Sequence, residues 1–492
     1  MLRLFDTMTG QKQDLKTREP RKVGIYVCGP TVYDFSHLGH ARVYVVFDTV
    51  VRYLRYRGYE VTYVRNFTDV DDKIISRAAE QSRDPVELAA EFIIAYGQDM
   101  ARLNVLPADV EPRVSGHIPE IVDAIERIER AGLAYERKGT VYFAVRRHGS
   151  YGKLSGRNLD DLCCGARVEV DTDKDDPLDF ALWKAAKPGE PHWPSPWGDG
   201  RPGWHIECSV MSTKYLGAEF DIHGGGMDLI FPHHENEIAQ SEAAYARGFA
   251  SYWMHNGFVN LNAEKMAKST GNFFSLRELF NHAEPEAIRL FLQSVQYRHP
   301  INFKVGADRD EGARFPDLVE AEHRLDYFYE TLCKLEDALA PMKAPGDGEV
   351  VPELDAARDG FAEAMDDDFN TAAALAPVSE LFRLANRLLE DPKAAPKKVR
   401  RRSLWRIREE AREIGGVLGL WQEHPSAYLS RRMEAMARCR GVDATWVEEQ
   451  IAARAAARLA KDFAAADAIR DALAEKGIEL MDSPLSTRWK FS

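Results

Sequence analysis

The chain has 492 residues, 45% of them hydrophobic, and a formal net charge of -13 at pH 7. Because a single core stops growing at roughly 250–300 residues, this length predicts two to four domains. No apolar run approaches the roughly 18 residues of a membrane span, and the first residues lack a secretory pattern, so we expect a soluble, cytoplasmic protein. The acidic total argues against indiscriminate nucleic-acid binding, and the 6 cysteines are too sparse for a disulfide scaffold.

The first candidate nucleotide-binding feature is a strand–helix–strand pattern near the N-terminus. Residues 23–28 indicate a buried strand, residues 38–57 have helical periodicity, and residues 60–65 indicate a second strand. This order predicts a βαβ unit, which is half of a dinucleotide-type fold. His37 and His40 fall at the start of the helix, where free N–H groups and the helix dipole attract phosphate. Their imidazoles can donate to phosphate oxygens, although two ordinary capping histidines would show the same spacing.

A second candidate feature is a pair of lysines past the middle of the chain. Residues 251–259 alternate enough to predict a strand, and Lys265-Met-Ala-Lys268-Ser269 follows after a short polar segment. The pattern predicts two ammonium groups on a loop, where they can stabilise the charge that accumulates on phosphoryl oxygens in a transition state. The alternative is a solvated pair of surface lysines.

A candidate metal site combines thiol, imidazole and carboxylate groups. Cys28 ends the first strand and Cys208 lies in a Gly-Trp-His-Ile-Glu-Cys segment. A helix predicted to begin after Pro232 places His233 and Glu237 four residues apart on one face. Two thiolates, one imidazole and one carboxylate form a credible tetrahedral zinc set. Because neither a Cys-x-x-Cys nor a His-x-x-x-His pair is present, two structural cysteines and a helix-capping histidine are the alternative.

Several segments together resemble cysteinyl-tRNA synthetase, a family of class I aminoacyl-tRNA synthetases. The segments His37-Leu-Gly-His40 and Lys265–Ser269 resemble the two ATP motifs of that class, with Ala267 where the family pattern has serine. The other segments occur in the family's order over about the first 280 residues: 26–34 (YVCGPTVYD), 66–73 (NFTDVDDK), 203–208 (GWHIEC), 223–228 (HGGGMD) and 231–237 (FPHHENE).

The resemblance implies a role for individual residues. It implies that one Zn²⁺ binds the substrate thiolate and that Mg²⁺ accompanies ATP. A zinc centre prefers thiolate over hydroxyl, whereas a hydrophobic pocket separates cysteine from serine poorly. The implied zinc ligands are Cys28, Cys208, His233 and Glu237, and the implied catalytic residues are His37, His40, Lys265 and Lys268. The implied ATP-binding residues are Pro30, Thr31, His37, Gly39, His40, Lys265, Lys268 and Ser269. The implied cysteine-binding residues are Gly29, Thr68, Trp204, His223 and Asp228.

The resemblance also implies the reaction, the fold and the partners. L-cysteine would react with ATP to give cysteinyl-adenylate, and the cysteinyl group would then pass to the 3′ adenosine of tRNA(Cys). No membrane partner is implied, and the protein could be a monomer. The implied fold is α/β, with a Rossmann-type nucleotide-binding catalytic domain that carries a connective insertion, then an α-helical bundle and a small C-terminal domain. The boundaries are 1–280 for the catalytic domain, about 112–203 for its insertion, 281–425 for the tRNA-binding bundle and 426–492 for the anticodon-recognition domain.

Two charged regions lie outside these motifs. Asp171, Asp173, Asp175 and Asp176 suggest calcium only superficially, because the glycine and closing glutamate of an EF-hand are missing, and we expect a solvated loop. From about residue 281 the pattern is helical, with an exposed loop at 341–352 and no strand until the last residues. A basic cluster there either binds RNA or forms a charged helix face. It comprises Lys397, Lys398, Arg400, Arg401, Arg402, Arg406, Arg408 and Arg412 around Trp405.

Two alternative functions compete with the synthetase. A cysteine ligase of the mycothiol pathway resembles the same catalytic core but passes cysteine to an amino-sugar. The roughly 200 residues after Lys265 favour tRNA as the acceptor, although length alone does not prove it. The other alternative is a noncatalytic, zinc-stabilised RNA-binding protein, and the intact histidines and lysines of both ATP motifs argue against it.

Overall fold

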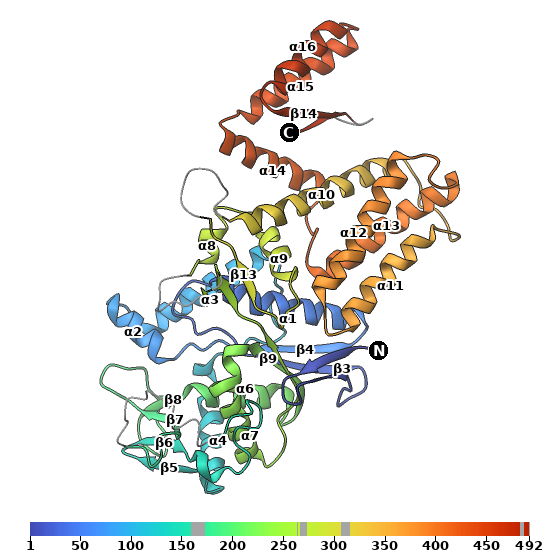
Figure 1. The fold of residues 1–492 in the computed structure, drawn as a ribbon. Coiled ribbons are helices and arrows are strands. Elements are labelled where there is room, and N and C mark those ends of the chain that lie inside the picture. The colour runs from blue at the N-terminus through green and yellow to red at the C-terminus, as the bar shows by residue number, and fades with distance from the viewer. Residues whose placement is uncertain (159–172, 263, 266–272, 307–314, 483–486, 492) are drawn as a thin grey trace. The chain divides into compact units, whose positions relative to one another are not determined.

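The computed structural model describes residues 1–158, 173–262, 264–265, 273–306, 315–482 and 487–491 (Figure 1). The chain divides into two compact units. The first comprises Met1–Ala321, Phe361–Leu375 and Val417–Gly419, and the second comprises Glu322–Gly360, Ala376–Gly416 and Leu420–Ser492. Across the described part of the chain, no helix combines the length and the apolar character that crossing a membrane requires.

A parallel four-stranded sheet forms the centre of the first unit. The strand order is β10-β9-β3-β4, and each neighbouring pair is parallel. The bounds are Lys22–Val27 for β3, Glu60–Arg65 for β4, Phe220–Gly226 for β9 and Ala250–Asn256 for β10. Helix α1 (Leu38–Tyr56) connects β3 to β4 and confirms the predicted βαβ unit. The strands are rich in buried apolar residues because helices cover both faces of the sheet (Figure 1).

The helix α1 packs unusually close to the sheet. Its Phe47 ring lies against Gly224 of β9, where a Cβ atom would come within 2.3 Å of the ring. Glycine at position 224 therefore permits the helix to approach the strand. Helix α9 (Pro285–Gln293) lies beside α1, while α6 (Trp204–Leu216) and α7 (Glu235–Tyr245) cover the opposite face of the sheet (Figure 1).

The strand order reverses between β3 and β9. The chain passes from β3 to β4 on one side, whereas β9 continues to β10 on the other side. In open α/β sheets, ligands bind beyond the carboxyl ends of the strands at such a switch point. Cys28 is the first residue after β3 and therefore lies at this position.

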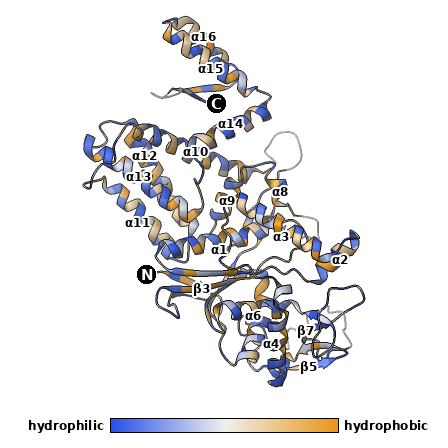
Figure 2. Cartoon of the chain, turned by 180° about the vertical axis from the view of Figure 1, so that it is seen from behind, coloured by the Kyte–Doolittle hydropathy of each residue, from blue (hydrophilic) through white to orange (hydrophobic). Residues whose placement is uncertain are grey.

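The expected insertion forms an antiparallel sheet of its own, in the order β5-β6-β7-β8. Its bounds are Ala134–Arg137 for β5, Thr140–Phe143 for β6, Phe180–Ala185 for β7 and Gly200–Pro202 for β8. Helix α4 (Ile118–Arg130) buries an isoleucine-rich stripe and turns a charged face outward (Figure 2). Short 3₁₀ turns occur at Val114–Gly116 and Val145–Arg147.

The described members of the acidic run lie on a partly exposed loop, as expected, and they are ion-paired. Asp173 pairs with Lys138 at 2.6 Å and Asp176 with Arg146 at 2.5 Å, and Asp175 pairs with Arg137. Asp171 lies outside the described residues. The basic partners come from the neighbouring β5–β6 region, which is distant in sequence, so spacing within the acidic run could not indicate them.

The remaining elements of the first unit surround the sheet. Their bounds are Arg3–Asp6 for β1, Gln11–Asp14 for β2, Asp72–Glu80 for α2, Pro85–Arg102 for α3, Val259–Leu261 for β11, Glu264–Lys265 for β12, Leu276–Leu279 for α8 and Ile301–Phe303 for β13. Strand β13 corrects the expectation that no strand follows residue 281 before the C-terminus. It pairs in parallel with β11 and is too short for alternation to reveal it in the sequence.

Helices dominate the second unit. Elements that lie wholly or partly in it are α10 (Pro316–Leu339), α11 (Pro352–Asp366), α12 (Thr371–Glu390), α13 (Lys397–Leu418), α14 (Pro425–Arg440), α15 (Ala444–Leu459), α16 (Phe463–Ala474), β14 (Ile478–Asp482) and β15 (Thr487–Phe491). Strands β14 and β15 form an antiparallel hairpin. The predicted loop at 341–352 is confirmed, because the chain between α10 and α11 contains neither helix nor strand.

The basic cluster lies on α13, and half of it has structural partners. Arg401 and Arg402 donate hydrogen bonds to backbone carbonyls of the loop between α10 and α11. Arg406 pairs with Glu410 at 2.7 Å, and Arg408 pairs with the neighbouring Glu409. The other members make no ion pair within the described residues: Lys397, Lys398, Arg400 and Arg412.

Candidate metal centre and active site

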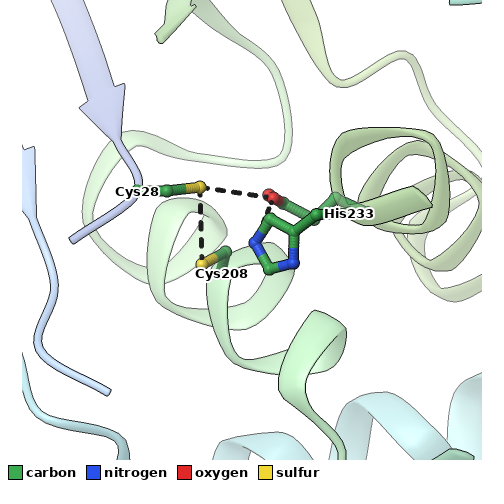
Figure 3. A group of neighbouring side chains, drawn as sticks. Cys28, Cys208 and His233 are labelled. Carbon is green, nitrogen blue, oxygen red and sulfur yellow. Dashed lines mark hydrogen bonds and ion pairs between the residues drawn. The ribbon is translucent and has the colours of Figure 1, made fainter. Parts of the chain in front are cut away.

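Four buried side chains converge at the carboxyl end of β3. Cys28 follows β3, Cys208 lies on α6, His233 lies in a π-helical turn (Ile230–His234), and Glu237 lies on α7. One donor atom from each side chain lies within 4.8 Å of all the others. Figure 3 shows the two cysteines and His233 pointing toward one another from these separate elements. Residues far apart in sequence therefore form one compact donor set.

The distances within this set match tetrahedral coordination. The Sγ atoms of Cys28 and Cys208 are 3.7 Å apart, and a tetrahedral zinc with Zn–S bonds of about 2.3 Å would place its thiolates about 3.8 Å apart. Nε2 of His233 lies 3.0 Å from Oε1 of Glu237, as expected for residues four apart on one helical face. The donors therefore fit a metal ion both in chemistry and in spacing.

The surroundings of the set favour the ionised forms of Cys208 and Glu237, but not of Cys28. Burial raises the pKa of the Cys28 thiol well above its usual value. Burial also opposes ionisation of Cys208, but hydrogen bonds with Cys28 and His233 outweigh it and lower the pKa of Cys208 to about 6. For Glu237, burial is outweighed by the charges of His223 and His233, which lower its pKa to about 2. A thiolate and a carboxylate are thus available to a cation.

Two further histidines contact the carboxylate and imidazole donors of this set. Nε2 of His223 lies 2.8 Å from Oε2 of Glu237, the second oxygen of that carboxylate. Nδ1 of His205 lies 2.9 Å from Nδ1 of His233. Such contacts orient metal ligands and fix the histidine tautomer. The sequence spacing indicated neither contact.

His234 contacts the donor set through Cys28. Its Nε2 lies 3.3 Å from Sγ of Cys28, and its Nδ1 lies 2.8 Å from Nε2 of His255 on β10. His234 makes no side-chain cap for α7, which a histidine at this position could have done. With His223, Cys28 and Glu237 it forms a second group whose geometry could hold a metal, sharing two residues with the first.

The predicted cysteine-binding residues fall into two groups. Thr68 is buried and follows β4, and the backbone N–H of Gly29 donates to Oδ1 of Asn66 at 2.8 Å. The ring of Trp204 lies against His233, with centroids 4.2 Å apart, and the side chain is 36% exposed. These residues therefore lie around the donor set and leave part of Trp204 accessible.

The other two predicted residues differ in exposure. His223 is fully buried and stacks on Trp253, with ring centroids 4.6 Å apart. Asp228 is exposed on the 3₁₀ turn Met227–Leu229, which follows β9. His223 therefore contacts the donor set through its bond with Glu237. Asp228 lies just beyond the carboxyl end of β9, the strand that carries His223.

The loops after β3 and β4 run side by side. The N–H of Thr68 donates to the carbonyl of Pro30 at 3.2 Å, and Thr31 forms a bridge with Thr68. A Cβ atom on Gly29 would come within 1.5 Å of the Asn66 carbonyl oxygen, so only glycine fits there. Pro30 and Thr31 are thereby held next to the donor set.

The histidines of the first ATP motif form the N-terminal cap of α1. His37 is the N-cap residue, and its Nδ1 accepts from the backbone N–H of His40 at 3.3 Å. The two rings are stacked, with centroids 3.8 Å apart. Gly39 lies in the first turn of the same helix. The capping alternative is therefore correct for Nδ1 of His37, and it places both rings at the positive end of the helix dipole.

The second ATP motif is described only at its first residue. Lys265 ends β12, opposite Asn260 of β11. Lys268 and Ser269 lie outside the described residues. The chain beyond them meets the first motif, because the N–H of Leu38 donates to the carbonyl of Phe274 and the N–H of Leu276 donates to the carbonyl of Ser36.

Comparison with known proteins identifies the family. Residues 14–308 match the model of the tRNA synthetases class I (C) catalytic domain. A cysteine–tRNA ligase of Anaeromyxobacter sp. (strain K) is 53% identical over 499 residues, covering 99% of each chain. This chain belongs to the cysteine–tRNA ligase family. A family member from Syntrophotalea carbinolica is 49% identical, again over 99% of each chain, and residues 360–422 match the DALR domain. As a cysteine–tRNA ligase family member, the chain is an ATP-dependent aminoacyl-tRNA ligase.

Solved structures support the fold of the cysteine–tRNA ligase family member. A Mycobacterium tuberculosis methionyl-tRNA synthetase in complex with methionyl-adenylate has a TM-score of 0.60 at 16% identity, covering 81% of this chain and 92% of that one. A putative arginyl-tRNA synthetase from Campylobacter jejuni has a TM-score of 0.55 at 12% identity, covering 84% and 95%. These matches confirm the α/β class I fold. The full-length match to cysteine–tRNA ligases also favours that function over the mycothiol-type and noncatalytic alternatives.

Proposed function

We propose that this chain activates L-cysteine with ATP to form cysteinyl-adenylate and transfers the cysteinyl group to the 3′ adenosine of tRNA(Cys) in the cytoplasm. The observation that carries this proposal is the buried Cys28, Cys208, His233 and Glu237 set at the switch point of a nucleotide-binding sheet. That position puts a thiol-selecting group where open α/β sheets bind their ligands.

The donor set is proposed to hold one Zn²⁺. When bound, zinc supplies a centre that prefers thiolate over hydroxyl and lowers the pKa of a bound thiol, which distinguishes cysteine from serine. The chain's own residues then position the rest of the amino acid. Gly29 and Thr68 form one side of this pocket, and Trp204 forms another. His223 and Asp228 complete the proposed cysteine-binding set.

The adenylation step needs charge stabilisation rather than a protein nucleophile. The cysteine carboxylate attacks the α-phosphorus of ATP, and pyrophosphate leaves. His37 and His40 at the helix terminus, with Lys265 and Lys268, are proposed to stabilise the phosphate charge. Mg²⁺ is proposed to accompany ATP, and the remaining ATP contacts are proposed to come from Pro30, Thr31, Gly39 and Ser269.

The later part of the chain is proposed to bind tRNA(Cys). We assign the catalytic role to residues 1–280, with the acceptor end held by the insertion at about 112–203. Residues 281–425 would bind the body of the tRNA, and residues 426–492 would recognise the anticodon. The cations of α13 that make no ion pair within the described residues support binding to the tRNA backbone. Phe463 of α16 is 63% exposed, which suits stacking on a base. A monomer is proposed as the working state.

The experiment that tests this function is cysteine-dependent ATP–pyrophosphate exchange, with serine as the competing substrate and bound zinc quantified. Exchange with cysteine alone, followed by charging of tRNA(Cys), supports the proposal. The Cys208→Ser variant should lose zinc and exchange together. Cys333→Ser is the matched control, because Cys333 is a buried cysteine of α10 outside the donor set. A zinc-loaded parent protein without exchange would refute the proposed function.

A further inference from the structure

A fully buried arginine lies two residues after the first ATP motif. Arg42 of α1 has no exposed surface, and it forms no ion pair with a carboxylate within the described residues. Burial accordingly lowers its pKa to about 10. A buried charge without a counterion is costly, so it needs compensation by hydrogen bonds.

Within the described part of the chain, that compensation comes from backbone carbonyls. One terminal nitrogen of Arg42 donates to the carbonyl of Leu292, near the end of α9. The other lies 3.3–3.4 Å from carbonyl oxygens of the following turn. We call residues 294–299, which connect α9 to β13, the junction turn. The carbonyls within it that face Arg42 are those of Val295, Gln296, Tyr297 and His299.

The junction turn is held on its other side by the segment that leads to the second ATP motif. The N–H of Gly257 donates to the carbonyl of Tyr297 at 2.8 Å, and the N–H of Ile301 donates to the carbonyl of Phe258 at 2.9 Å. The approach is so close that a Cβ atom on Gly257 would lie 2.4 Å from the carbonyl carbon of His299. The junction turn is therefore hydrogen-bonded to Arg42 on one side and to the residues just before β11 on the other.

A continuous series of backbone contacts leads from the junction turn to Lys265. Strand β13 leaves the turn and pairs with β11, with Val259 opposite Ile301. Strand β11 also pairs with β12, and Lys265 lies opposite Asn260. Arg42 itself shares α1 with His37 and His40. The side chain of Arg42 thus links the helix of one ATP motif to the strand that carries the first lysine of the other.

The side chains of the junction turn are fixed separately by Asp368. Its carboxylate accepts from Tyr297 at 2.8 Å and from Arg298 at 2.7 Å. These bonds hold the outer edge of the turn. Among the described residues, the carbonyl of Tyr297 also accepts from the N–H of Gly257 and that of Gln296 from the N–H of His299, while Arg42 is the side-chain donor to the turn. Removing Arg42 should therefore shift the turn relative to α1 without releasing it from Asp368.

We propose that Arg42 is a positioning residue for adenylation, which holds the junction turn so that Lys265 keeps its place relative to His37 and His40. The inference rests on the proposed function, in which these groups bind ATP. An arginine suits the role because its planar guanidinium spreads donors over several carbonyls, whereas a lysine ammonium is compact and lies on a shorter side chain.

The test compares Arg42→Lys, Arg42→Met and Gly257→Ala in the full-length, zinc-loaded protein. Pyrophosphate exchange is measured over a range of ATP and, separately, of cysteine concentrations. Because a misplacement of about 1 Å can cost up to about 100-fold in rate, we expect kcat to fall by about 10- to 100-fold and the KM for ATP to rise. The KM for cysteine and the bound zinc should stay within about twofold. Arg42→Lys should retain more activity than Arg42→Met.

Arg289→Lys is the matched control. Arg289 is equally buried and lies on α9, but it pairs with Asp48 and with carbonyls away from the junction turn. This variant should lower the Tm without the ATP-specific change. A parent protein without exchange would refute the proposed function. An active parent whose Arg42→Lys and Gly257→Ala variants keep parental ATP kinetics, or lose cysteine and ATP binding equally, would refute only the inference about Arg42.

Discussion

The hydroxyl of Thr68 donates a hydrogen bond to Oε2 of Glu207 at 2.8 Å, and both side chains are buried. Glu207 immediately precedes Cys208 on α6, whereas Thr68 belongs to the loop after β4. The bond therefore joins a proposed wall of the cysteine pocket to the helix that carries a proposed metal ligand. Oε1 of Glu207 is buried without a hydrogen-bond partner within the described residues.

The first prediction concerns this bond. Glu207→Ala removes the acceptor of the Thr68 hydroxyl, and a buried polar group left unpaired costs about 1–3 kcal/mol. We expect the KM for cysteine in pyrophosphate exchange to rise about tenfold, with the KM for ATP unchanged. Glu207→Gln keeps an acceptor oxygen and should show a smaller change. Equal effects on cysteine and ATP would mean that Glu207 only supports the fold.

The second prediction concerns the close approach of two loops. Gly29→Ala would push its Cβ into the Asn66 carbonyl, so we expect loss of cysteine-dependent exchange and a destabilisation of about 1–3 kcal/mol in urea unfolding. Gly97→Ala is the matched control, because Gly97 is an exposed residue within α3 and nothing lies within 4 Å of its added Cβ. It should stabilise the protein by about 0.5–1 kcal/mol. Normal exchange in Gly29→Ala would contradict the close loop packing.

The third prediction concerns tRNA. Replacing Lys397, Lys398 and Arg412 with glutamate should weaken tRNA(Cys) binding and reduce the salt dependence of charging, because each removes a possible phosphate contact. Pyrophosphate exchange should not change. Arg401→Gln serves as the control, since Arg401 bonds to the loop between α10 and α11 and should affect stability more than tRNA affinity. Unchanged tRNA binding in the triple variant would show that this helix face is only solvated.

The fourth prediction concerns pH. Hydrogen bonds from Arg454 hold the pKa of Asp482 far below its usual range, and Thr487 also donates to this carboxylate. A carboxylate with a lowered folded-state pKa stabilises the protein above its unfolded pKa of about 3.9 and loses that effect as the pH falls further. Asp482→Asn should therefore lower the free energy of unfolding by about 0.5–1 kcal/mol at pH 7, the size expected for a partly exposed ion pair. The difference between the variant and the parent protein should shrink below about pH 4. Urea unfolding followed by fluorescence, at both pH values, provides the measurement.

The sequence predicted those parts of the structure that depend on local pattern. The helix expected after Pro232 is a π-helical turn (Ile230–His234) followed by α7, which begins at Glu235. His233 and Glu237 still meet, because residues four apart along a helical path share a face. The βαβ unit from β3 to β4 was equally predictable from periodicity. Both cases need only the order of residues within one segment.

The missed features depend on contacts between distant segments. His255 has no spacing relation to the donor set, and only the folded sheet brings it next to His234. His205 lies three residues before Cys208 on α6, but its contact with His233 joins two distant segments. Arg42 resembles any polar residue of an amphipathic helix, and its buried carbonyl partners lie about 250 residues further along the chain. Strand β13 has 3 residues, which is too few for an alternation of apolar and polar residues to be recognised in the sequence.

The donor set has a consequence for biosynthesis on the ribosome. Cys28 is made early, Cys208 follows 180 residues later, and Glu237 later still. A nascent chain that ends before Glu237 holds an incomplete set of the proposed ligands, so it could not bind metal with full affinity. Metal binding by the complete proposed set would therefore require that both halves of the central sheet have already met.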